Sequence, residues 1–148
     1  MNRMIKKLYP LFFIVFLLGC SPYIGGTLVA TPLPSNLSLS QINSLWIQND
    51  SRIVLKDNKE QCAIYDIRFS SLESPLSFQT CYRKSGIAGD DSWGYSVEGG
   101  ILKAKVSEDK VESLKSEMED LMDRIEKAIR HNYPETGIKK YLNTPMGR

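Results

Sequence analysis

Three cysteines and one histidine are the side chains best suited to metal or redox chemistry in this sequence of 148 residues. Cys20 ends an apolar run, whereas Cys62 and Cys81 lie in the body of the chain. A structural zinc site needs about four Cys or His ligands at short spacings, and a redox pair needs C-x-x-C. Neither pattern is present, so we expect no metal site and no cofactor.

His131 is the only imidazole of the chain and falls near the end of a predicted helix, where a partly positive side chain suits the helix dipole. A general base needs an acidic partner and a nucleophile beside it. The sequence also lacks the G-x-S-x-G, H-E-x-x-H and glycine-rich phosphate-loop motifs. We therefore expect no catalytic residue and predict that the protein is not an enzyme.

The stretch "SGIAGDDSW" joins two predicted strands and is the candidate binding loop. Its two acidic residues lack the alternating oxygen ligands and the bidentate Glu of a calcium loop. Trp93 has the ring needed to stack on a sugar or a peptide, but packing in the core is the favoured interpretation. Asp90, Asp91 and Trp93 are the candidate contact residues.

The N-terminus has the pattern of a secretory signal peptide. Its apolar run, 11–18, is about half the length that a membrane-spanning helix requires. A basic leader, a short apolar core and a small-residue cleavage site define a signal peptide. A buried core helix is the alternative, and Pro10 and Pro22 at its two ends disfavour it. The basic leader is formed by Arg3, Lys6 and Lys7.

The end of this run, Leu17-Leu18-Gly19-Cys20, resembles the lipobox of bacterial lipoproteins. The resemblance implies cleavage before Cys20, a diacylglycerol thioether on its sulfur and an acyl chain on the new amine. Leu18 is a departure from the lipobox, which more often has Ala or Ser at this position. Ser21, in place of the Asp that retains lipoproteins in the inner membrane of enteric bacteria, implies the outer membrane, facing the periplasm.

Cleavage would change the charge of the protein. The precursor has a net charge of +2, and removal of the basic leader leaves 16 basic against 17 acidic side chains. No basic patch remains that would indicate nucleic-acid binding. In an exported protein, the remaining pair, Cys62 and Cys81, is expected to form a disulfide.

The chain is predicted to divide into four parts. We expect a cleaved signal peptide over 1–19, a lipidated N-terminus and flexible tether over 20–40, a single domain over 41–131 and a flexible tail over 132–148. The tether is expected because its segment is rich in Pro, Gly, Ser and Thr and has no charge. Leu28–Ala30 could add an edge strand, which Pro32 and Pro34 would soon end. The predicted fold class is α+β: a small antiparallel sheet, a meander of about five strands, with one C-terminal helix packed on it.

Alternating apolar residues predict a three-stranded meander over 52–83. A hairpin joins 52–56 to 61–69, with Lys56 facing Gln61. A third strand over 76–83 follows. The register that places Cys62 opposite Cys81 also puts the apolar side chains of the two strands on one face. Before this meander, 45–49 is predicted as a strand, although Ser38 and Gln41 would also suit a helix capping box.

A second hairpin is predicted around Gly99-Gly100, a pair that suits a two-residue turn with positive φ. Its two strands would place six apolar side chains on one face: Trp93, Tyr95 and Val97 opposite Val106, Ala104 and Leu102.

A helix is predicted from Glu108 to about Arg130, with Ser107 as its N-cap. Apolar residues recur at steps of three and four, and Met122 and Ile129 widen their stripe, so packing on the sheet is favoured. A dimerising coiled coil is the alternative. A helix-mediated oligomer would then use Val111, Leu114, Met118, Leu121 and Ile125.

The functional expectation is a non-catalytic, membrane-anchored lipoprotein of the bacterial cell envelope. It would bind an envelope protein as an accessory or structural subunit of a machine for secretion, conjugation or outer-membrane assembly. The alternative is a lipoprotein that inhibits or excludes an external protein. The anchor, the tether and the small stapled domain motivate both hypotheses.

Overall fold

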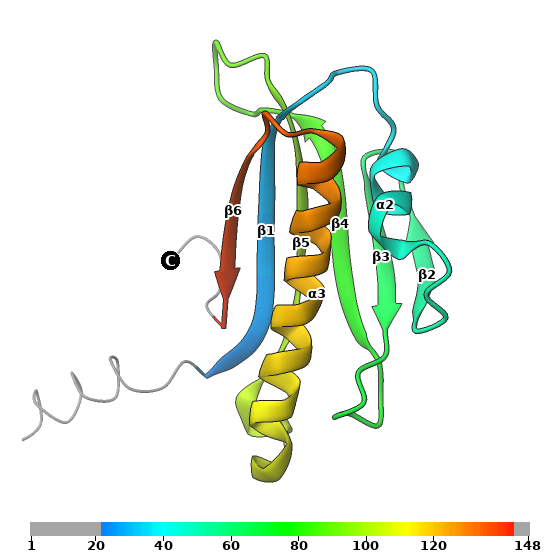
Figure 1. Cartoon of the computed structure of the whole chain (residues 1–148), viewed down its shortest axis with the longest axis vertical. Coiled ribbons are helices and arrows are strands. Elements are labelled where there is room, and N and C mark those ends of the chain that lie inside the picture. Colours follow the sequence, from blue (N-terminus) through cyan, green and yellow to red (C-terminus); the bar gives the residue numbers. More distant parts are fainter. Residues whose placement is uncertain (1–21, 144–148) are drawn as a thin grey trace, which may run out of the picture.

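The described part of the chain, residues 22–143 of a computed structural model, forms one antiparallel sheet with two helices on one face (Figure 1). The strand order is β2-β3-β4-β5-β1-β6, so the predicted α+β class is confirmed with six strands. The strands are β1 (Tyr23–Leu33), β2 (Ile53–Asn58), β3 (Cys62–Ile67), β4 (Leu76–Lys84), β5 (Trp93–Leu102) and β6 (Gly137–Leu142). The helices are α2 (Leu39–Ile47) and α3 (Val111–Asn132), with short 3₁₀ turns η1 (Lys103–Lys105) and η2 (Glu108–Lys110).

The flexible tether predicted over 20–40 is wrong from Tyr23 onward. Residues 23–33 form β1, which lies between β5 and β6 in the sheet. Ile24, Leu28 and Ala30 are fully buried under the helices. The glycines allow a close approach, because a Cβ on Gly26 would lie 2.6 Å from Cγ of Met122 on α3. A composition typical of a linker therefore belongs to a strand that a helix covers closely.

The flexible tail predicted over 132–148 is also wrong for Gly137–Leu142, which form the edge strand β6. This strand pairs with β1 from Thr31 opposite Gly137 to Gly26 opposite Leu142. Lys140 contributes ion pairs to Asp123 and Glu126 of α3. Because the partner strand lies about one hundred residues earlier in the chain, no local pattern indicated this pairing.

The strand predicted over 45–49 is wrong, because Leu39–Ile47 form helix α2. Ser38 Oγ accepts a hydrogen bond from the Gln41 amide at 3.1 Å, and the Gln41 side chain accepts one from the Ser38 amide at 2.8 Å. This reciprocal capping box satisfies two of the amides that a helix start leaves without partners. Ile42 and Trp46 then face the core.

The hairpin predicted at Gly99-Gly100 does not exist. Trp93–Leu102 run as one strand, β5, between β4 and β1. A Cβ on Gly99 would lie 2.5 Å from the ring of Phe78, and one on Gly100 would lie 2.4 Å from the ring of Tyr23. These glycines make room for aromatic rings on neighbouring strands instead of forming a turn.

The predicted register of β3 and β4 is confirmed, with Cys62 opposite Cys81 and Ile67 opposite Leu76. The cysteines form the predicted disulfide. The register predicted for β2 and β3 is wrong, because the Lys59 amide donates to the Cys62 carbonyl at 2.8 Å and closes a tighter turn. A bulge between Leu55 and Asp57 shifts the pairing by one residue, so that Ile53 pairs with Ile67 and Asp57 pairs with Ile64.

The long helix is confirmed, since α3 follows directly on η2, which begins at Glu108. It packs on the sheet, mainly over β1 (Figure 1). The five residues proposed for a coiled-coil seam are all buried within the single chain, so these side chains are not free to form a dimer seam: Val111, Leu114, Met118, Leu121 and Ile125.

Candidate functional site

The loop over 85–92, called the distal loop, projects from the sheet at the end opposite the start of β1 (Figure 1). Its shape is set by hydrogen bonds within the loop. The Ser85 amide donates to the Ser92 carbonyl at 2.8 Å, and the Asp90 amide donates to the Ile87 carbonyl at 3.1 Å. Gly89 has φ +83°, a conformation that glycine adopts without strain. The distal loop is therefore preorganised by local contacts.

The two predicted acidic contact residues differ in their partners. Asp90 Oδ1 accepts a hydrogen bond from the Ser92 amide at 2.9 Å, and hydrogen bonding to Ser92 lowers the pKa of Asp90. Asp91 has a side chain 90% exposed and lies 3.0 Å from the ammonium of Lys84. One carboxylate therefore shapes the loop, while the other faces solvent beside a lysine.

Trp93 is the first residue of β5 and is half-buried. Its ring lies 4.9 Å from the ring of Tyr82, centroid to centroid, and pairs of this kind stabilise a core beyond their buried area. Its backbone pairs with Lys84 and Leu33 on the flanking strands. Trp93 therefore packs against Tyr82 and the edge of the core, whereas its role as a contact residue stays a prediction.

A cleft of about 430 Å³ lies under the distal loop, with a floor of small side chains. Thr31, Gly94 and Ser96 supply these small side chains, and Arg83 and Ile87 also line the cleft. Ile87 is 72% exposed and is the most exposed large apolar side chain among residues 22–143. Together, the distal loop and this cleft are called the distal surface.

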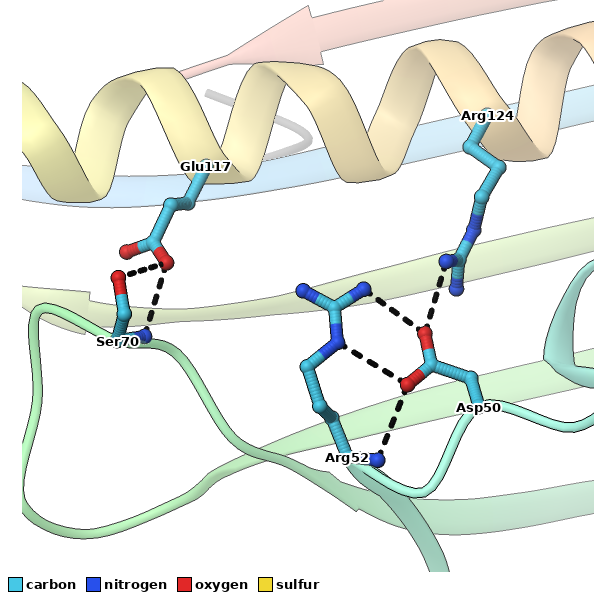
Figure 2. A network of polar contacts seen from close by, with 5 residues as sticks. All are labelled: Asp50, Arg52, Ser70, Glu117 and Arg124. Atoms are coloured by element: carbon cyan, nitrogen blue, oxygen red, sulfur yellow. Dashed lines mark hydrogen bonds and ion pairs between the residues drawn. The ribbon is translucent and has the colours of Figure 1, made fainter.

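A second polar site, which the sequence did not indicate, joins α3 to the segment after α2 (Figure 2). Asp50 Oδ2 lies 2.8 Å from Nη2 of Arg52 and 2.8 Å from Nη1 of Arg124. Asp50 Oδ1 also accepts from the Arg52 amide and its Nε, both at 3.0 Å. These hydrogen bonds, led by that of the Arg52 side chain, hold the pKa of Asp50 well below its ordinary value.

Glu117 of α3 makes a parallel connection to the turn after β3 (Figure 2). Its carboxylate accepts from the amide and hydroxyl of Ser70 at 2.8 and 2.5 Å, and from those of Ser71 at 3.2 and 2.6 Å. Burial alone would raise the pKa of Glu117, but the hydrogen bonds from both serines outweigh it and lower the pKa. The carboxylate therefore acts as a hydrogen-bond acceptor that fixes the turn.

These two connections border a cleft of about 260 Å³, which also includes Phe69, Asp120 and Leu121. Both carboxylates have lowered pKa values and are already bonded to groups of the chain, so neither is poised to exchange a proton near neutral pH. Charged groups tied together in this way fix two loops to α3. We assign the cleft a structural role.

A buried hydrogen-bond chain ties α2 to the sheet. Trp46 Nε1 donates to the Tyr95 hydroxyl at 2.8 Å, and that hydroxyl donates to Asn43 Oδ1 at 2.6 Å. The Asn43 amide nitrogen donates to the Tyr65 hydroxyl at 3.2 Å. Burial raises the pKa of Tyr95, which keeps the phenol neutral and able to donate. Such a satisfied network specifies how α2 docks.

The remaining predicted site residues lie apart from one another. Cys20 and Ser21 fall outside the described residues, whereas Cys62 and Cys81 form a disulfide between β3 and β4. His131 lies in the last turn of α3. Within residues 22–143, no group of three or more His, Cys, Asp or Glu side chains is arranged to hold a metal ion. Neither helix in this range combines the length and apolar character of a bilayer span.

Comparison with known proteins identifies no relative. No protein-family model matches the chain, and neither a curated protein nor a solved structure matches it.

Proposed function

We propose that the chain is a non-catalytic lipoprotein of the bacterial cell envelope that is anchored through Cys20 and binds a partner protein with its distal surface. The partner would belong to a machine for secretion, conjugation or outer-membrane assembly, with this chain as an accessory subunit. The supporting observation is the opposite placement of two features. β1 begins three residues after Cys20, and the distal loop lies at the other end of the sheet.

The separation of these two features follows from strand length. Tyr23 pairs with Leu102 at one end of β5, and the distal loop immediately precedes Trp93 at the other end. A strand of ten residues spans about 30 Å at roughly 3.3 Å per residue. An anchor at Cys20 would therefore leave the distal surface about one domain length from the bilayer, where a partner has access.

The disulfide supports a location outside the cytoplasm. Disulfides persist in oxidising compartments such as the bacterial periplasm and are rare where thiols are kept reduced. Cys62 and Cys81 lie directly opposite each other on adjacent strands, so the bridge forms between residues that the sheet already brings together. This feature agrees with export and is independent of the lipobox.

The distal surface has the composition of a small protein-binding site. Exposed Ile87 provides an apolar anchor, Arg83 and Lys84 line the same cleft, and Asp91 forms an ion pair with Lys84. Interfaces commonly combine a central apolar or aromatic anchor with a polar rim. The hydrogen bonds within the loop reduce the entropy lost on binding, because the loop is already ordered.

Extraction of the lipidated protein in mild detergent tests the proposal. The wild type should co-purify with an envelope protein, and Ile87→Ser should lose that protein. Val54→Ser is the matched control, because Val54 on β2 is also exposed (57%) but lies far from the distal loop. Isolation of the wild type as a lone monomer, or equal loss with both variants, would contradict the proposal.

An inhibitor or exclusion lipoprotein that acts on an external protein is the second candidate. The internal hydrogen bonding of the distal loop favours it, since preorganised loops suit tight inhibitory binding. In this case the purified protein should inhibit its target in detergent without any bilayer. An accessory subunit should instead be needed for assembly of its complex in the membrane.

A further inference from the structure

The start of the described chain is fixed to the fold from its first residue. The Pro22 carbonyl accepts a hydrogen bond from the Lys103 amide at 2.7 Å, and Tyr23 pairs with Leu102 at the end of β5. Only Ser21 therefore separates Cys20 from a residue that the fold holds. Two residue steps span at most about 7 Å of extended chain, so an acylated Cys20 would hold this end against the bilayer.

The same end carries an exposed apolar side chain and several lysines. Leu102 is 52% exposed, although it terminates a strand of the sheet. The turns η1 and η2 follow it and bring Lys103, Lys105 and Lys110 to this end. Figure 1 shows the first turns of α3 at this end as well. The lysine stems and the leucine suit the boundary between headgroups and acyl chains, where long cationic side chains keep their charge in the polar layer.

A cleft of about 540 Å³ opens between these turns and the loop before β4. Lys105 and Lys110 line it together with apolar Leu72, Leu76 and Ile101. A mixed apolar and cationic lining matches the chemistry of a phospholipid, which has a phosphate next to hydrocarbon. Glu73, Glu108 and Asp109 lie at the same end and balance the charge of its three lysines. The short link from Cys20 to β1 would therefore hold this end at the membrane, because it keeps the effective concentration of lipid high.

We propose that this end, the proximal surface, docks on the phospholipid headgroup layer of the membrane that holds the anchor; the inference rests on the proposed lipidation of Cys20. The proximal surface consists of Tyr23, Leu102, Lys103, Lys105 and Lys110. Leu102 lies in the interface, and the lysines lie among lipid phosphates. The strands then stand away from the bilayer, which gives the distal surface a fixed orientation towards its partner.

Tryptophan fluorescence in vesicles tests this orientation. Lipidated Leu102→Trp protein is reconstituted into vesicles of phosphatidylethanolamine and phosphatidylglycerol that contain lipids with a nitroxide quencher on the headgroup. Ile87→Trp, at the distal surface, is the matched control, and the wild type supplies the signal of Trp46 and Trp93. Ala104→Trp on exposed η1 is a second proximal probe.

The expected result is about a twofold loss of the added emission for the proximal probes and little loss for Ile87→Trp, because the headgroup layer is only about 5–7 Å thick. Vesicle flotation separates the two proposals. Protein that floats with the vesicles without quenching of either proximal probe overturns the docking surface and leaves the anchor intact. Equal quenching of proximal and distal probes also overturns it. Protein that does not float overturns the anchor, and the docking surface with it.

Discussion

The distal loop and the centre of the sheet use glycine for different reasons. Gly89 in the loop has φ +83°, which glycine adopts without strain, whereas the glycines of the sheet make room for neighbouring side chains. No atom lies within 4 Å of the position that a Cβ would take on Gly86 or Gly89, whereas Cβ atoms on Gly26 and Gly99 would overlap the side chains of Met122 and Phe78. Local hydrogen bonds set the shape of the loop, and packing between distant segments sets the shape of the sheet. Changes in the loop should therefore have little effect on stability, whereas changes in the sheet should affect folding.

The largest effect on stability is expected from loss of the disulfide between β3 and β4 in the sheet. Replacing both cysteines, Cys62→Ser and Cys81→Ser, should lower the free energy of unfolding by about 3 kcal/mol, because the bridge closes a loop with a sequence separation of 19. Urea denaturation of oxidised wild type and the double variant measures it. A difference below about 1 kcal/mol would show that the bridge adds little to the packing of β3 on β4.

Gly99→Ala tests the packing of the sheet centre without changing charge or polarity. Its Cβ would lie 2.5 Å from the ring of fully buried Phe78, so we expect a loss of about 2 kcal/mol. Gly86→Ala is the matched control and should change stability by less than about 0.5 kcal/mol. Equal melting temperatures for the two variants would contradict the distinction between loop and sheet.

The network around Asp50 should contribute less, because its arginines are partly exposed. Asp50→Asn removes the charge that Arg52 and Arg124 share and should cost about 1–2 kcal/mol. Lys84→Met removes the partner of Asp91 at the distal loop and should cost less than about 0.5 kcal/mol. A larger loss of stability in Lys84→Met than in Asp50→Asn, measured by urea denaturation, would contradict this ranking of the two ion pairs.

The same network sets a pH dependence. The folded pKa of Asp50 lies below its unfolded value of about 3.9, so its contribution is present above that pH and is lost as the pH falls towards the folded pKa. Glu117 and Glu126, whose pKa values are also lowered, add to the loss in acid. Below about pH 4 the wild type should lose stability more steeply than Asp50→Asn in urea titrations. Parallel curves would contradict this assignment.

Ile87→Ser should have the smallest effect on stability and the largest effect on binding. The side chain is exposed and contributes little to the core, so the free energy of unfolding should change by less than about 0.5 kcal/mol. Circular dichroism on heating checks this value. If the variant were strongly destabilised, loss of the partner could no longer be assigned to the distal surface.

The parts of the fold predicted from sequence are those with local causes. Alternation along β3 and β4 predicted the register that pairs Cys62 with Cys81, and the periodic apolar residues predicted α3. The Gly99-Gly100 pair predicts a turn locally, because the ring that requires Gly99, on Phe78, belongs to another strand. The sequences of β1 and β6 indicate a linker and a tail, because the pairing of these strands joins segments more than one hundred residues apart.

The site residues divide in the same way. The composition of one loop predicts Asp90 and Asp91 as contact residues, and this role stays a prediction. The connection between Asp50 and Arg124 could not, because 74 residues separate them and neither side chain is unusual in its local sequence. The capping box at Ser38 and Gln41 is a correct local signal for helix α2, whereas the apolar residues after it favour a strand.

The proposed anchor at Cys20 is tested most directly by intact-mass spectrometry of the protein isolated from the membranes of a Gram-negative bacterium, with Cys20→Ser as the control. We predict a mature chain that begins at Cys20 and carries a diacylglycerol thioether, and a Cys20→Ser chain that retains residues 1–19 without lipid. A wild-type chain with an unmodified Cys20, or a Cys20→Ser protein with the same lipidated mass, would contradict the anchored arrangement of the two ends.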